Sequence, residues 1–302
     1  MHCDHGLIGT ADLQVRSSHE AGLEARGPIM IAAIVKRRAG RWALNGAAAI
    51  ALAYILTPLT FVTWLAFFRQ EIPSFPPEGY SLKWFAAILD QRKFVDGFVM
   101  SFQVGVLATL IGLMLGVPAA LAVSRHQFAG RAPVANLLLM PLIVPGVVLG
   151  TAMYVFHVEV ENGLDVDVLG TFYALVSGHI VIVIPWVVRL VTASLSGVDR
   201  SIEEAAQNLG ANALVTFWRI TLPAIRPGIV AGALFAFVTS FGNLEMSLFL
   251  VGPGRTTLPI VILQYLEWKI DPTIAAVSVV QILLIGGAML ITDRYVKLTR
   301  VV

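Results

Sequence analysis

The stretch Glu204-Ala205-Ala206-Gln207-Asn208-Leu209-Gly210 lies in a polar loop between two long hydrophobic segments, and Ile220-Thr221-Leu222-Pro223 follows it. Asp199 or Ser201 can cap a short helix here, with acidic residues in its first turn where the helix dipole favours them. The two alanines are small enough for another protein to approach closely, and the final glycine permits a sharp turn. These features predict a docking segment and not a catalytic site.

The composition of the chain is that of a membrane protein. Hydrophobic residues make up 57% of the 302 positions and charged residues only 13%, with a mean hydropathy of +0.79. Soluble domains carry about 25% charged residues. The net charge of +2 is small, and no basic face interleaved with aromatics occurs, so we expect no nucleic-acid partner.

The uncharged residues gather in long segments. A helix needs about 20 mostly apolar residues to cross a bilayer, and six segments qualify. We therefore expect an all-α fold, a polytopic membrane bundle of six transmembrane helices. Prolines inside these segments are tolerated where neighbouring helices satisfy the freed carbonyls, and such kinks suit a bundle that opens and closes. The expected spans are residues 42–68, 97–124, 132–158, 168–188, 227–244 with a continuation past Glu245 to 254, and 272–292.

The distribution of Lys and Arg predicts the orientation, because cytoplasmic loops carry the excess of these residues. By our assignment, fifteen of the 21 basic residues fall on the side of the polar loop and six on the other. The opposite-side loop 159–167 carries four acidic residues and no basic one. We expect a multi-pass inner-membrane protein with both termini and the loop 196–226 in the cytoplasm.

The first 41 residues differ from the rest. Most of segment 1–41 lacks hydrophobic periodicity, which favours a disordered or amphipathic cytoplasmic leader, and Met30 is an alternative start. Cys3 is the only cysteine, which excludes an intrachain disulfide and a CxxC metal site. His2, Cys3 and His5 leave a metal site as a minor alternative, but we expect no metal.

The spacing E-A-A-x-x-x-G, then nine residues, then I-x-L-P closely resembles the signature of permease subunits of type I ATP-binding-cassette importers. The resemblance covers roughly residues 43–300 and implies a six-helix permease domain over 42–300. In that family the loop forms a coupling helix that sits in a groove of the ATPase subunit. The resemblance implies that the contact is made by Glu204, Ala205, Ala206 and Gly210, and that Leu222 and Pro223 transmit its motion.

The same resemblance implies the partners: a dimer of cytoplasmic ATPase subunits, a second permease subunit identical or different, an extracytoplasmic solute-binding protein and membrane lipid. The chain itself contains no G-x-x-x-x-G-K-[ST], H-E-x-x-H or G-x-S-x-G motif. We therefore expect neither an enzyme nor a cofactor. A self-sufficient secondary carrier or channel is the alternative from another class, although no inverted repeat supports it; a scaffold that only docks a partner is a third.

The solute is suggested by further resemblances. Leu209 stands where sugar importers usually carry Asp. The loop, the outer stretch 75–85 and Leu250–Pro253 look like the second permease of spermidine/putrescine-type importers. This favours a polyamine or a related organic cation. Phosphonate, iron or another small solute stays open, because the subgroup includes such importers.

Two ionisable residues are expected well inside spans. A carboxylate in hydrocarbon costs at least about 2.5 kcal/mol, so Glu245 should face either a partner such as Arg255 or the solute path. Polyamine importers carry several acidic residues in this neighbourhood, whereas this chain keeps one, and Asn243 lies beside it. His179 fits a satisfied interhelical hydrogen bond better than a ligand.

Overall fold

The computed structural model describes residues 40–295, so the expected leader lies almost wholly outside the described residues. Within them every long element is a helix, and extended pairing is limited to two isolated bridges, Phe68 with Tyr80 and Gly252 with Arg255. The expected all-α fold class is confirmed. The chain divides into two compact units, with the boundary along the sequence between Phe61 and Val62.

The first unit contains most of the helix Gly40–Leu65. This helix has 26 residues, more than the number needed to cross a bilayer. Apolar side chains such as Leu44, Ile50 and Ile55 are exposed along it. A helix that is apolar on all sides is typical of a membrane span.

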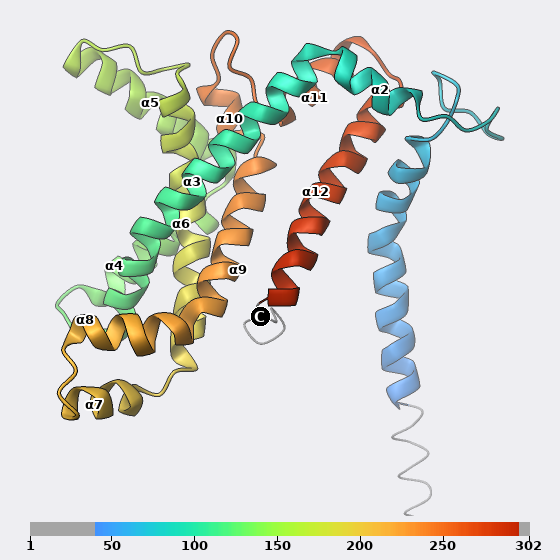
Figure 1. The fold of residues 1–302 in the computed structure, drawn as a ribbon. Helices are drawn as coiled ribbons and strands as arrows, with labels where there is room; N and C mark the ends of the chain where they lie inside the picture. Colours follow the sequence, from blue (N-terminus) through green and yellow to red (C-terminus); the bar gives the residue numbers. More distant parts are fainter. Residues whose placement is uncertain (1–39, 296–302) are drawn as a thin grey trace, which may run out of the picture. The chain divides into compact units, whose positions relative to one another are not determined.

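The core of the second unit is formed by three long helices, α3 (Arg92–Arg125), α6 (Phe172–Ser196) and α9 (Leu222–Phe241), which lie side by side (Figure 1). Branched aliphatic side chains of α6, including Val183 and Val187, fill this core. Gly228 of α9 lies so close to α6 that an added β-carbon would be 2.7 Å from the carbonyl oxygen of Leu190. Small residues of this kind let membrane helices approach closely.

The six expected spans are found as five long apolar helices and one bent pair. The third span is the pair: residues 131–142 and 146–164 are bent by 105° at a short break that includes Pro145, a much sharper bend than the kinks expected from prolines inside the spans. Pro145 has extended backbone as the N-cap of α5 and lacks an amide hydrogen, so a single helix does not run through this position. The other spans are Gly40–Leu65, Arg92–Arg125, Phe172–Ser196, Ala213–Phe241 and Thr273–Arg294.

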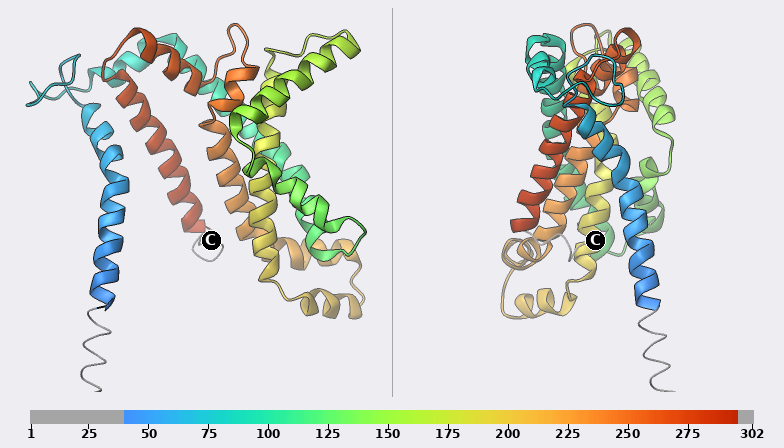
Figure 2. Two further views of the ribbon diagram at one scale, coloured as in Figure 1. Left: turned by 180° about the vertical axis from the view of Figure 1, so that it is seen from behind. Right: turned by 90° about the vertical axis from the view of Figure 1, so that its right-hand side faces the viewer.

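Shorter elements lie at the two ends of the second unit. At one end are α4 (Arg131–Leu139), α7 (Arg200–Asn208) and α8 (Ala213–Thr216); at the other are α2 (Lys83–Asp90), α10 (Glu245–Leu250) and α11 (Leu258–Trp268) (Figures 1 and 2). A 3-10 turn (Met140–Leu142) leads to α5 (Gly146–Leu164), and the last helix is α12 (Thr273–Tyr295). This arrangement places the polar loop and Glu245 at opposite ends of α9.

Candidate functional site

The helix α7 is built by local interactions that the sequence predicts. Asp199 is its N-cap, and its carboxylate accepts a hydrogen bond from the backbone N–H of Ser201 at 2.9 Å. That hydrogen bond holds the pKa of Asp199 below its ordinary value. The helix therefore starts at a charged cap that is ionised at neutral pH.

The end of α7 depends on Gly210. Its φ is +92°, and its N–H donates to the carbonyl of Gln207 at 2.9 Å, while the N–H of Ala211 donates to the carbonyl of Ala206 at 3.0 Å. This pair of bonds is the Schellman motif, in which a left-handed glycine satisfies the last helical carbonyls. Nothing lies within 4 Å of the position that a β-carbon on Gly210 would take, so the glycine is needed for its backbone and not for space.

The outward side of the loop is exposed. Glu204 and Ala205 lie on the surface and Ala206 is half-buried. Leu209 is 90% exposed, and Leu214 and Trp218 are also exposed further along the chain. Large apolar side chains on such a surface are typical of a protein interaction site. We call this segment, residues 202–218, the α7–α8 surface.

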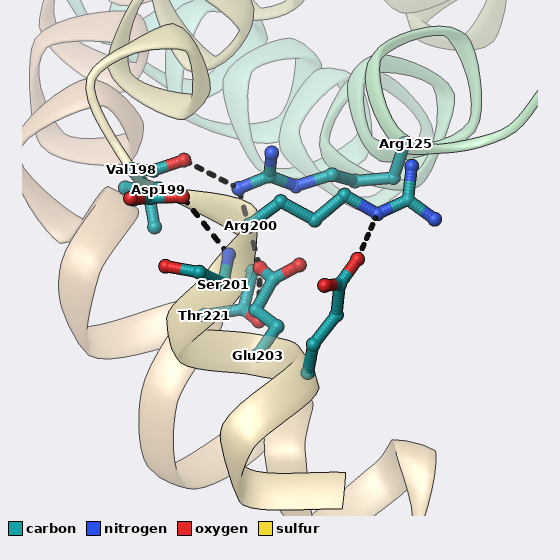
Figure 3. A network of polar contacts seen from close by, with 8 residues as sticks. Arg125, Val198, Asp199, Arg200, Ser201, Glu203 and Thr221 are labelled. Carbon is teal, nitrogen blue, oxygen red and sulfur yellow. Dashed lines mark hydrogen bonds and ion pairs between the residues drawn. The ribbon is translucent and has the colours of Figure 1, made fainter.

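Glu203 faces the other way, towards the membrane helices (Figure 3). Its Oε1 lies 3.3 Å from Nη2 of Arg125, the last residue of α3, and accepts a hydrogen bond from the hydroxyl of Thr221 at 2.9 Å. Arg125 also donates to the carbonyl of Val198 at 3.1 Å. Sequence reasoning placed Glu203 only in the first turn of a helix. It missed this role because the partners are distant in sequence.

The segment that contains Leu222 and Pro223 differs from our expectation. We placed residues 196–226 in a loop and began the fifth span at residue 227, but α8 and α9 belong to one continuous helix, Ala213–Phe241. A π-helical turn, Phe217–Thr221, joins them, and the N–H of Leu222 donates to the carbonyl of Phe217. Leu222 is half-buried and Pro223 is exposed. Pro223 has no backbone N–H to donate, and the wider π turn before it lets the helix continue without that hydrogen bond.

The second set of candidates lies at a break between α9 and α10. Asn243 lies two residues before α10, and its side-chain oxygen accepts a hydrogen bond from the N–H of Met246 in the first turn at 2.8 Å. Glu245 is the first residue of α10 and is exposed, so the fifth span is interrupted between Phe241 and Glu245 and does not continue as one helix past it. Its carboxylate lies against Gly146 of α5, in the space that a β-carbon at that position would need. Among residues 40–295 it forms no ion pair, with Arg255 or any other group.

His179 on α6 bridges the two sides of this break. Its Nδ1 lies 2.7 Å from the hydroxyl of Ser240 on α9, and its Nε2 lies 3.2 Å from the hydroxyl of Ser247 on α10. Ser247 donates its own hydrogen to the carbonyl of Asn243 at 2.8 Å. Nε2 must therefore carry the proton, and Nδ1 accepts from Ser240. The buried histidine is a satisfied interhelical link, as the sequence suggested.

The candidate docking residues and the candidate solute-path residues lie far apart in the structure. α9 has 20 residues and is thus about 30 Å long, with Leu222 and Pro223 at one end and Asn243 and Glu245 beyond the other. In residues 40–295 no cluster of three or more His, Cys, Asp or Glu could hold a metal ion. His2, Cys3 and His5 lie outside the described residues.

Comparison with known proteins points to one family. The model of a family described as "Binding-protein-dependent transport system inner membrane component" matches residues 108–299. The chain is 30% identical to the putrescine transport system permease protein PotI of Escherichia coli (strain K12), over 66% of this chain and 72% of that protein. It is also 30% identical to a probable molybdenum ABC transporter permease protein of Haloferax volcanii, over 61% of this chain and 70% of the other.

A solved structure shares the fold. It is a bacterial ABC transporter involved in the import of the acidic polysaccharide alginate, and its superposition has a TM-score of 0.69 at 17% identity. The match covers 85% of this chain and 95% of that one. At this identity the likeness establishes the fold of a type I importer permease and nothing about the solute.

Proposed function

The chain belongs to the family of binding-protein-dependent transport system inner membrane components, and from that membership we propose that it forms the path of a polyamine or a related amine across the inner membrane. It is a permease subunit of an ABC importer. The nature of the solute and the docking of its partners are the parts that are proposed.

The exposed carboxylate of Glu245 is the observation that supports an amine. It lies at the break between α9 and α10, near the membrane helices, and without a cationic partner among residues 40–295. An unpaired carboxylate in such a place lowers the energy of a cation that passes it and raises that of an anion. The similarity to a putrescine permease supports the same choice.

Molybdate is the rival solute, because a relative that is also 30% identical, over 61% of this chain, is named as a probable molybdenum permease. Molybdate is an oxyanion, so it would be repelled by Glu245. The deciding experiment is calorimetry on the cognate solute-binding protein with putrescine, spermidine and molybdate. Retention of a polyamine supports the proposal, and retention of molybdate alone contradicts it.

The α7–α8 surface is the proposed docking site of a separate ATPase. Three properties support this role: the helix is short and capped at both ends, its outer side is exposed, and apolar side chains accompany it. The residues proposed to touch the ATPase are Glu204, Ala205, Ala206 and Gly210. Because Leu222 and Pro223 continue directly into α9, motion of the docked helix would pass into that span.

The remaining partners and the orientation complete the proposal. A second permease subunit would complete the path, and an extracytoplasmic binding protein would deliver the solute at the end that carries α10 and α11. The basic residues Arg125, Arg131 and Arg200 lie at the end that carries α7, which supports a cytoplasmic position for that end. A cytoplasmic position of both termini is proposed from the excess of Lys and Arg along the sequence.

A further inference from the structure

Two adjacent glutamates of α7 have opposite surroundings. The side chain of Glu204 is 61% exposed and pairs only with Arg200, one turn earlier on the same helix, at 3.3 Å. The side chain of Glu203 is 13% exposed, and its partners belong to other elements. An exposed pair within one helix adds little stability, whereas a carboxylate withdrawn from water depends on its partners.

The partners of Glu203 connect three parts of the chain. Arg125 is the last residue of α3, and its side chain is 17% exposed. The same guanidinium nitrogen that faces Glu203 also donates to Val198, just before α7. Thr221 is buried in the π turn at the start of α9. A single carboxylate oxygen thus meets α3 and α9 together, as Figure 3 shows.

We infer that Glu203 is a positioning residue that fixes α7 to α3 and to the start of α9, while Glu204 remains on the exposed side of α7, where a partner can reach it. A helix connected only by its loops could tilt without moving the spans. The Glu203 contacts remove that freedom, so a displacement of α7 is passed to α3 and α9 at the same time. The inference rests on the proposed docking of an ATPase on α7 for its functional consequence, but not for its geometry.

The geometry is tested without the ATPase, by spin labels at Asn208 on α7 and Gln127 beyond α3, after Cys3 is replaced by Ser. We expect Glu203→Ala to broaden the distribution of distances between the labels. Glu203→Gln should restore part of the narrow distribution, because an amide oxygen still accepts from Thr221. Glu204→Ala is the matched control and should leave the distribution unchanged. An unchanged distribution in Glu203→Ala would overturn the inference.

The consequence is tested in the assembled transporter, as ATP hydrolysed per solute imported. Glu203→Ala should retain the ATPase on purification and continue to hydrolyse ATP, while uptake falls by roughly fivefold or more. Glu204→Ala should release the ATPase instead. If Glu204→Ala keeps the ATPase while the spin-label result holds, the docking proposal fails and the positioning role stands. If both variants lose uptake and ATPase alike, Glu203 has no separate role.

Discussion

Nδ1 of His179 lies 2.7 Å from the hydroxyl oxygen of Ser240, and this contact joins α6 to α9 immediately before the break that precedes Glu245. The other ring nitrogen reaches Ser247 beyond the break. One side chain of α6 therefore holds both sides of the discontinuity, and the position of Glu245 depends on a residue of another helix.

Replacement of this histidine should be costly. His179→Ala removes a buried side chain and leaves the hydroxyls of Ser240 and Ser247 without their partner, so we expect a loss of about 2–4 kcal/mol of stability. Thermal unfolding of the purified protein in detergent measures it. His126→Ala is the control, since His126 is exposed. Equal melting temperatures for the two variants would show that the link contributes nothing.

Gly210 should be sensitive to any β-branched replacement. At a φ of +92° a valine is strained by at least about 1–2 kcal/mol, so Gly210→Val should distort the end of α7. We expect the variant to insert into the membrane but to lose solute uptake and the co-purifying ATPase. Gly286→Val serves as the control, because Gly286 also has open space around it but does not have positive φ. Full uptake by Gly210→Val would show that the loop only connects two spans and has no docking role.

Glu245→Gln tests the charge at the break. The substitution preserves shape and removes the negative charge, so we expect uptake of a cationic amine to fall by roughly tenfold while the complex still assembles. Glu159→Gln, at another exposed carboxylate, should transport normally. Normal transport by both variants would argue against a role of Glu245 in the solute path. Failure of Glu245→Gln to assemble would instead support a structural role for the contact between Glu245 and Gly146.

Asp271, between α11 and α12, gives a pH-dependent stability. Burial alone would raise the pKa of its carboxyl, but hydrogen bonds from Thr273, Tyr265 and Lys269 outweigh burial and lower the pKa. A lowered folded-state pKa stabilises the fold above the unfolded pKa, and this contribution is lost as pH falls through the folded value. Asp271→Asn should therefore melt earlier than the wild type at about pH 7, and the difference should shrink as the pH falls below the ordinary Asp pKa of about 4. A difference that persists in acid would contradict this account.

Local chemistry made α7 predictable. Asp199 and Gly210 act on their own neighbours, so the start and end of the helix follow from residue types alone. The effect of the prolines on the helices was harder to predict, because it depends on the packing around each proline. Pro145 lies at the 105° break between residues 131–142 and 146–164, whereas Pro227 lies inside a continuous span that contains a π turn at residues 217–221.

Contacts between distant segments were not predictable. Nothing near Glu203 in sequence points to Arg125, since the pairing arises only when α3 and α6 pack together and bring the ends of the two helices side by side. The sequence did indicate that His179 would be satisfied by hydrogen bonds, but the two serine partners come from the packing of α6 against α9 and α10.

ATP-dependent uptake in proteoliposomes tests the central claim most directly. The permease would be reconstituted with its second permease subunit and ATPase, with ATP enclosed and the binding protein outside. Labelled putrescine should accumulate only when ATP and the binding protein are both present. Accumulation by this chain alone, without ATP, would contradict the account and identify a self-sufficient carrier.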